Sequence, residues 1–346
     1  MNYKNKIKGC MMASAIGDAL GYEVEFDKEP AIFKRFGPLG IQDYVLHNGY
    51  ALVSDDTQMS MFSANAMIVA SNKQEDVMEV LKKAYYYWYL TQVLDYDKLE
   101  DPQTLEKDFY LMNDRRLYQN RAPGITCMDA CSAGCKGSFE NLINHSKGCG
   151  GIMRIAPIAC AYDLTMDSKK VAMLCAKASA LTHTHELGYL PSAYLGYMLH
   201  QLIHSNQSIE ALHKQCKEVL QTLFPKAIHL NELLEITDLA IELSHQKLND
   251  LDAIHQLKEG WVAEETLAIA LYCANKYSDD FTKAITTAVN HNGDSDSTGA
   301  VCGNLLGAYL GYDIIPSKYI ETLEMKDLLE HLIHELCMIC RKNDEK

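Results

Sequence analysis

Small residues recur at every fourth position in two stretches near opposite ends of the chain, and this spacing constrains the fold strongly. The two sets are Gly9, Ala13, Gly17 and Gly21, and Gly299, Gly303, Gly307 and Gly311. In a helix, a spacing of four places these positions on one face. Each glycine inside a helix costs about 0.5–1 kcal/mol relative to alanine, so the pattern indicates helices whose backbones approach closely in the core. Two interpretations are open. The two faces either serve tight packing alone, or they also bring Asp18 close to Asp294 and Asp296.

The rest of the chain also follows helical periodicity. Apolar residues recur every three or four positions in segments 231–247, 262–277, 280–290, 297–310 and 317–341, and the whole chain has only eight prolines. The candidate strands, 41–46 and 51–53, are short. No linker divides the chain, although region 92–124 is irregular and charged. We therefore predict an all-α protein, folded as a single compact orthogonal multi-helix domain over residues 1–346, with a C-terminal helix within 313–346.

Composition excludes several classes of protein. The chain has 346 residues, of which 48% are hydrophobic, which is enough for a sizeable core. A net charge of −14 disfavours binding to nucleic acid. The chain has no run of 18 apolar residues, so no membrane span is expected. Twelve cysteines are too dilute for a disulfide scaffold in a chain of this length, and they indicate free thiols in a reducing cytoplasm.

Two acidic segments each precede an apolar helix. Ser54-Asp55-Asp56-Thr57 stands before residues 59–69, and Asp294-Ser295-Asp296-Ser297 stands before residues 300–310. Each segment can be a helix N-cap. Each can also supply oxygen ligands to a hard divalent cation. An EF-hand is excluded for the second segment, because its glycine precedes the aspartates and no glutamate follows at the required distance.

Together the two segments supply about six oxygen ligands, which is enough for two magnesium or manganese ions. Two such ions about 3.5–4 Å apart can orient a substrate diol and activate water.

Six motifs in a fixed order carry a family resemblance. They are GDALG (17–21) followed by Glu25, SDDT (54–57), GCGGIMRIAP (148–157), LTH (181–183), GWVAEE (260–265) and GDSDST (293–298). In this order the chain resembles the ADP-ribosylglycohydrolase family over roughly residues 5–312. The resemblance implies an all-α fold, two magnesium or manganese ions and the removal of ADP-ribose from a modified protein side chain.

The resemblance also assigns the ion-binding and reacting residues. The implied metal ligands are Ser54, Asp55, Asp56, Asp294, Asp296 and Ser297. The implied catalytic residues are Glu25, Asp55 and Asp296. Without the resemblance, Glu25 would be read as a surface carboxylate in a loop after a helix.

The implied ADP-ribose contacts lie in three of the motifs. They are Gly148, Cys149, Gly150, Gly151, Ile152, Met153, Arg154, His183, Trp261 and Val262. The glycines suit close approach of the backbone to a pyrophosphate or a ribose. Cys149 stands where the family commonly has asparagine. Arg154 can instead be a structural residue of the core, and Trp261 can instead be a core or interface aromatic.

The linkage that is cleaved remains open. The GWVAEE motif resembles bacterial enzymes that act on ADP-ribosyl-arginine, and this substrate is favoured. Serine-linked ADP-ribose and small ADP-ribosylated molecules are alternatives. A non-catalytic immunity protein that neutralises a cognate ADP-ribosyltransferase is a third. The expected partners are an ADP-ribosylated protein and ADP-ribose.

Overall fold

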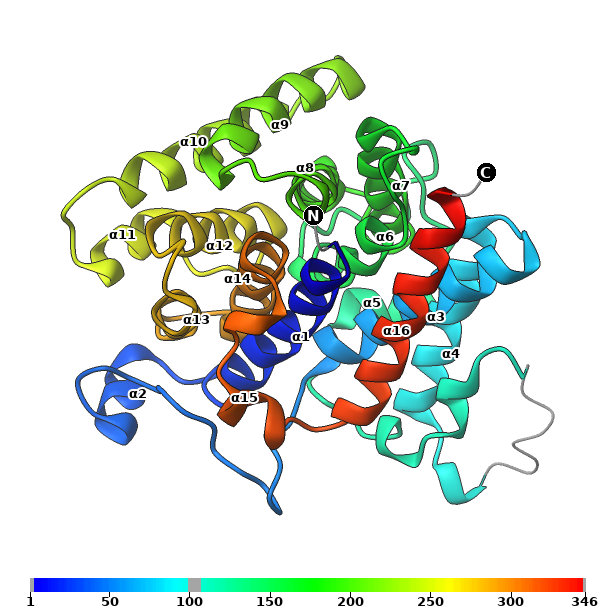
Figure 1. Cartoon of the computed structure of the whole chain (residues 1–346), viewed down its shortest axis with the longest axis horizontal. Coiled ribbons are helices and arrows are strands. Elements are labelled where there is room, and N and C mark those ends of the chain that lie inside the picture. The colour runs from blue at the N-terminus through cyan, green and yellow to red at the C-terminus, as the bar shows by residue number, and fades with distance from the viewer. Residues whose placement is uncertain (1–2, 99–106, 345–346) are drawn as a thin grey trace.

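A computed structural model describes residues 3–98 and 107–344 (Figure 1). This part of the chain contains α-helices and short 3-10 helices but no β-strand, so the all-α prediction is confirmed. The α-helices are α1 Tyr3–Tyr22, α2 Glu29–Phe36, α3 Asp55–Lys73, α4 Val77–Val93, α5 Ile125–Ser132, α6 Ala156–Cys160, α7 Ser168–Ala180, α8 Glu186–His204, α9 Ile209–Leu223, α10 Leu230–Ser244, α11 Asp250–Leu257, α12 Ala263–Lys276, α13 Phe281–Val289, α14 Ser295–Leu310, α15 Ser317–Glu321 and α16 Lys326–Asp344. The 3-10 helices are η1 Tyr96–Lys98, η3 Tyr110–Asn113, η4 Arg115–Leu117, η5 Cys149–Gly151 and η6 Tyr312–Ile314.

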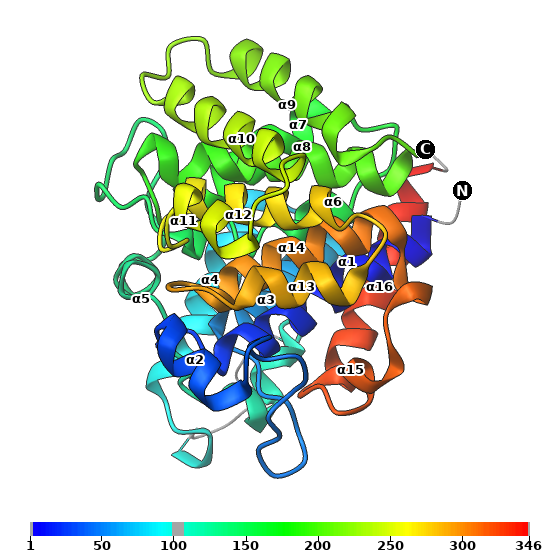
Figure 2. The same ribbon diagram turned by 90° about the vertical axis from the view of Figure 1, so that its left-hand side faces the viewer.

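Helices α1 and α14 lie side by side at the centre of a single compact domain (Figures 1 and 2). Helices α12 and α13 pack on one side of this pair, and α16 packs against α1 and α3. Helices α9, α10 and α11 lie at the outer edge (Figure 1). No helix of the described chain is long and apolar enough to cross a membrane. No cysteine of the described chain forms a disulfide bond.

The two sets of small residues meet in this central pair. A Cβ atom added to Gly17 would overlap the carbonyl oxygen of Gly299, and one added to Gly21 would overlap the carbonyl oxygen of Ser295. The two backbones are therefore in direct contact, as the spacing predicts. In this register the last turns of α1 face the first turn of α14. The charge of Asp296 acts on Asp18, so the small residues also bring these acidic groups together.

Neither candidate strand, 41–46 or 51–53, forms a strand. The backbone of Ile41 hydrogen-bonds the side chain of Asn290, with Asn290 Oδ1 accepting from Ile41 N at 2.7 Å and Asn290 Nδ2 donating to Ile41 O at 2.9 Å. Ala51 forms only an isolated bridge to Leu323. The backbones of Ile41 and Ala51 thus hydrogen-bond without a neighbouring strand.

Two other predicted segments differ in detail. Segment 317–341 is not one helix, because α15 ends at Glu321 and α16 begins at Lys326, with Met325 at a φ of 55° between them. The irregular region 92–124 contains the end of α4 and then η1, η3 and η4, and its residues 99–106 lie outside the described chain.

Candidate active site

The two acidic segments begin two helices whose N-termini meet. Ser54 is the N-cap of α3, and its Oγ accepts a hydrogen bond from Asp56 N at 3.2 Å. Asp294 is the N-cap of α14 and accepts from Ser297 N at 3.3 Å. Ser297 Oγ donates to Asp56 Oδ2 at 2.9 Å. The capping interpretation is therefore confirmed, and the two caps are joined directly.

Asp18 connects the central helix pair to α3. Its carboxylate accepts hydrogen bonds from Ser54 N at 3.0 Å and from Thr57 N at 3.1 Å, and a further one from the Thr57 hydroxyl. Unpaired N–H groups and the helix dipole make this N-terminus favourable for an anion. Asp18 thus fixes the position of the Ser54–Thr57 turn. The sequence marks Asp18 within a motif but does not reveal this role.

Glu25 lies in the turn after α1 and is buried, which contradicts the surface interpretation. It is 7% exposed, and its Oε2 has no hydrogen-bond partner within the described chain. One carboxylate oxygen each from Glu25, Asp294 and Asp296 lies within 4.8 Å of the others. A buried acceptor without a donor, next to two more carboxylates, is an environment that suits a cation.

Six acidic side chains with almost no exposure surround this point. They are Asp18, Glu25, Asp55, Asp56, Asp294 and Asp296. No lysine or arginine of the described residues forms an ion pair with any of them. The ligand atoms that these side chains offer to a metal are all oxygens, which magnesium and manganese prefer. We call these six residues the acidic cluster.

Burial and mutual repulsion disfavour the charged forms of five carboxyl groups of the acidic cluster, those of Asp18, Glu25, Asp55, Asp56 and Asp294. Burial first, and then the charge of Asp296, raises the pKa of Asp18 to about 7 and that of Glu25 to about 11. The same two causes raise the pKa values of Asp55, Asp56 and Asp294 well above their usual range. Without a cation, protons compensate the charge.

This gives a prediction for stability. Raised carboxyl pKa values mean that the folded state without cations binds more protons than the unfolded chain, so its stability falls as pH rises above about 4. A divalent cation replaces those protons, and its stabilisation should therefore grow between about pH 5.5 and pH 8. At about 100 times its dissociation constant a cation adds about 2.7 kcal/mol, or about 4 °C in Tm for a chain of this length.

Thermal unfolding with magnesium and with EDTA, at several pH values, measures this difference. A magnesium effect that stays constant or shrinks as pH rises would contradict the prediction.

All members of the acidic cluster except Asp18 line a cleft of about 760 Å³. Twelve residues singled out in the sequence line it: Glu25, Asp55, Asp56, Gly148, Cys149, Gly150, Met153, His183, Trp261, Asp294, Asp296 and Ser297. The structure thus brings together motifs that are more than 200 residues apart in the chain. Five others do not line the cleft, namely Ser54, Gly151, Ile152, Arg154 and Val262.

One wall of the cleft was not predicted. It comprises Asn120, Ala122, Pro123, Gly124, Ile125, Thr126, Cys127 and Met128. Phe26, in the turn after α1, also lines the cleft. Asp55 N donates to Arg121 O at 3.0 Å, and Gly124 N donates to Asp55 Oδ2 at 3.4 Å. The segment before α5 is therefore tied to the acidic cluster. No charge pattern in this segment signals its position.

The glycine-rich segment packs against His183. Gly148 and Gly150 lie so close to the His183 ring that a Cβ atom at Gly150 would be 3.1 Å from it. His183 Nδ1 is 2.8 Å from Thr182 Oγ1, and burial, with the charge of Arg154, lowers the pKa of His183 to about 3. A neutral imidazole therefore faces the cleft, held by close backbone contact.

Arg154 lies behind the cleft wall rather than in it. It is fully buried, its Nη2 donates to Thr182 Oγ1 at 2.6 Å, and its guanidinium stands 4.2 Å from the centre of the Tyr85 ring. Gly151 and Ile152 are also buried, and a Cβ atom at Gly151 would overlap Ser179 Oγ. These three residues lie behind the lining of the cleft, and their contacts with ADP-ribose stay a prediction.

Trp261 and Val262 occupy different positions. Trp261 is 39% exposed at the rim of the cleft, and its ring stacks on that of Phe26 at a centroid distance of 6.3 Å. It is therefore not a core aromatic. Val262 forms an isolated antiparallel bridge with Gly148. Through this bridge Val262 holds the glycine-rich segment, and it does not line the cleft itself.

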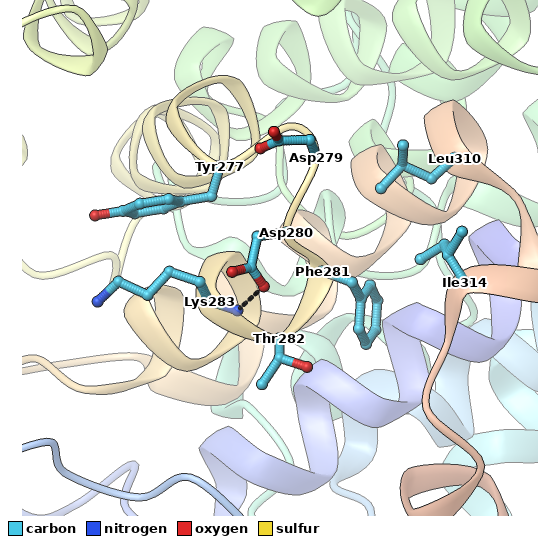
Figure 3. A pocket seen from close by; sticks show the side chains of 8 residues that line it. All are labelled: Tyr277, Asp279, Asp280, Phe281, Thr282, Lys283, Leu310 and Ile314. Atoms are coloured by element: carbon cyan, nitrogen blue, oxygen red, sulfur yellow. Dashed lines mark hydrogen bonds between the residues drawn. The ribbon is translucent and has the colours of Figure 1, made fainter.

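A second cavity, of about 580 Å³, lies at the other end of α14. Figure 3 shows Leu310 and Ile314 on one side of it, and Tyr277 and Lys283 on the other. Asp280 is already used there as the N-cap of α13, accepting from Lys283 N at 2.9 Å. Within the described residues, the Glu25–Asp294–Asp296 group is the one set of three potential metal ligands that converge. The cleft, and not this second cavity, is therefore the candidate site for a cation.

Comparisons with known proteins agree with this geometry. A family model described as ADP-ribosylglycohydrolase matches residues 1–346. The ADP-ribosyl-(dinitrogen reductase) glycohydrolase of Rhodospirillum rubrum is 25% identical over 323 residues, covering 92% of this chain and 90% of that protein. Human ADP-ribosylhydrolase ARH3 is 25% identical over 228 residues, covering 58% of this chain and 59% of that protein.

A solved structure shows a similar fold. It is described as an ADP-ribosylglycohydrolase-related protein complex and aligns with a TM-score of 0.68 at 22% identity. The alignment covers 98% of this chain and 99% of the other.

Proposed function

The chain belongs to the ADP-ribosylglycohydrolase family and is a hydrolase, and from this premise we propose that it removes ADP-ribose from modified arginine side chains with the help of two divalent cations. The observation that carries the proposal is the convergence of two helix N-termini and Glu25 on one buried acidic cluster in a cleft. A cleft of about 760 Å³ has room for a ligand of this size.

In this proposal the ions are held by the carboxylates and hydroxyls at the starts of α3 and α14. The proposed ligands are Ser54, Asp55, Asp56, Asp294, Asp296 and Ser297. Magnesium or manganese would supply electrostatic stabilisation and an activated water. Ser54 is the one proposed ligand that does not line the cleft, although its Oγ keeps a lone pair beside the one that accepts from Asp56 N.

The bond to be broken joins the ribose anomeric carbon to the protein side chain, and the transition state resembles an oxocarbenium ion. Glu25 stands next to Asp294 and Asp296 with one carboxylate oxygen free. We assign it the proton transfer that accompanies cleavage. The glycine-rich segment and His183 lie in the same cleft and would hold the ADP-ribose.

Our proposal of an arginine linkage rests on the GWVAEE motif, which resembles the corresponding segment of bacterial enzymes that act on ADP-ribosyl-arginine. The lack of disulfide bonds among the twelve cysteines of the described chain supports our proposal of a reducing, cytoplasmic location. A cognate ADP-ribosyltransferase, which would create the substrate, is a proposed partner.

The test measures free ADP-ribose released from an arginine-modified and a serine-modified protein, each with magnesium and with EDTA. We expect magnesium-dependent release from the arginine-modified protein. Release from the serine-modified protein alone would overturn the linkage. No release from either, by a folded protein, would favour the immunity-protein alternative.

A further inference from the structure

Lys147, directly before the glycine-rich segment 148–151, is bound to the start of helix α12 at two points. Its backbone oxygen accepts a hydrogen bond from Ala263 N at 2.8 Å, and its ammonium group forms an ion pair with Glu264. The next residue, Gly148, forms the isolated bridge with Val262. The beginning of the glycine-rich segment is therefore attached to the first turn of α12 by its backbone and by a side chain.

The ion pair between Lys147 and Glu264 is not an ordinary surface contact. The side chain of Glu264 is 1% exposed, whereas that of Lys147 is 34% exposed. Burial raises the pKa of Glu264, and the hydrogen bond and charge of Lys147 oppose that rise. Among the described residues, Lys147 is the one cation that pairs with this carboxylate. Because an unpaired buried charge is much costlier than an unpaired exposed one, Glu264 holds Lys147 firmly in place.

The same stretch of chain also contacts the acidic cluster. Glu259 O accepts a hydrogen bond from Asp294 N at 2.9 Å, and a Cβ atom added to Gly293 would overlap this oxygen. Asp294 is the N-cap of α14 and a proposed metal ligand. Residues 259–264 thus contact the acidic cluster at one end and the glycine-rich segment at the other. This double contact gives the GWVAEE motif a structural role that its sequence does not reveal.

The position of the glycine-rich backbone matters because of what else lines the cleft. No lysine or arginine is among the described residues that line it, although the pyrophosphate of ADP-ribose is negatively charged. Gly148 and Gly150 line the cleft and have only backbone atoms to offer. Backbone N–H groups bind an anion well only when the chain fixes their direction before the ligand arrives. Whatever fixes this segment therefore influences the affinity of the cleft for ADP-ribose.

We propose that Lys147 and Glu264 are positioning residues, whose ion pair fixes the glycine-rich segment where it binds ADP-ribose. Neither residue lines the cleft, so both act through the backbone of residues 148–151. Loss of the pair leaves the acidic cluster in place, and it should therefore raise KM with little effect on kcat. The effect on ADP-ribose rests on the proposed function, whereas the effect on the segment itself does not.

Cys149 reports the position of this segment without any ligand. It is half-buried in the segment, its Sγ donates to Asp294 Oδ2 at 2.7 Å, and the other eleven cysteines are buried. The rate of its alkylation by iodoacetamide is measured in EDTA on the full-length protein, with the modified peptide identified by mass spectrometry. Lys147→Met, which removes the charge but keeps the length of the side chain, should raise this rate at least fivefold. The eleven buried cysteines should stay unmodified, which separates local opening from unfolding.

Two further variants and one control accompany this measurement. Glu264→Gln removes the other charge and should also raise the rate at least fivefold, whereas Lys147→Arg keeps the ion pair and should stay within about twofold of the wild type. Lys217→Met is the matched control, because Lys217 is 31% exposed and pairs with Asp238 between α9 and α10, away from the cleft. The control should leave the rate unchanged.

Calorimetry with ADP-ribose and steady-state kinetics then test the link to the ligand. Lys147→Met should weaken ADP-ribose binding and raise KM at least tenfold, with kcat within about threefold of the wild type and Lys147→Arg close to the wild type. An unchanged alkylation rate in both Lys147→Met and Glu264→Gln overturns the proposal, whether or not the wild type binds ADP-ribose. A faster rate with unchanged ADP-ribose affinity overturns the positioning role. A wild type that neither binds nor releases ADP-ribose contradicts the proposed function instead, and the alkylation rates still decide whether the ion pair holds the segment.

Discussion

Replacing Asp296 with asparagine is expected to reduce magnesium-dependent ADP-ribose release by more than about 100-fold. Residues that only support metal ligands already change activity about 10–100-fold, and Asp296 is a proposed ligand itself. It lies in the first turn of α14 and shares the Glu25–Asp294 group. Initial rates at saturating magnesium measure the effect.

The same substitution is expected to stabilise the cation-free protein. The charge of Asp296 raises the pKa values of Asp18, Glu25 and Asp294, so removing this charge relieves repulsion in a buried site. Urea unfolding in EDTA should show a higher midpoint for Asp296→Asn than for the wild type. Asp279→Asn, an exposed change at the far cavity, should alter neither property. Normal turnover, or a lower midpoint in EDTA, would refute the assignment.

The second large effect is expected at the central helix contact. Gly17→Ala should lower the free energy of unfolding by about 2–3 kcal/mol or more, because its Cβ would overlap the carbonyl oxygen of Gly299. Alanine improves helix propensity by about 1 kcal/mol, but a backbone carbonyl cannot rotate away as a side chain can. The cost of the steric overlap therefore exceeds the gain in helix propensity, and the net effect is a loss of stability.

Gly124→Ala is the matched control. A Cβ atom at Gly124 meets nothing within 4 Å, and its φ of −61° suits any residue. We expect it to be neutral or to stabilise by up to about 1 kcal/mol. Equal effects at both positions, measured by denaturant unfolding, would show that close backbone contact is not what Gly17 provides.

Local patterns allowed much of the fold to be predicted. The four-residue spacing of Gly9–Gly21 and Gly299–Gly311 predicts close helix contact, and the structure confirms it for Gly17 and Gly299. This prediction was possible because it needs only the positions of residues on one helix face. By contrast, segment 41–46 has a strand-like composition but forms no strand, and the backbone of Ile41 bonds instead to the side chain of Asn290, 249 positions away.

The candidate site, like the fold, could be predicted only in part from the sequence. Acidic pairs at two helix starts are visible in sequence, and their convergence with Glu25 is what the structure adds. The wall around Asn120–Met128 could not be predicted, because its role depends on the backbone contacts of Arg121 and Gly124 with Asp55. The interior position of Arg154 depends on Thr182 and Tyr85, which no local pattern reveals.

The contact between α1 and α14 also sets an order of events during synthesis. Helix α1 ends at Tyr22, whereas α14 begins at Ser295. At a synthesis rate of about 5–20 residues per second, the ribosome makes α14 on the order of 15–50 s after it has made α1. Until then its glycine face and Asp18 lack their native neighbours, and contacts between such distant segments form slowly. A nascent chain of this protein therefore cannot assemble its acidic cluster early, and premature termination before α14 yields a product without the cleft chemistry.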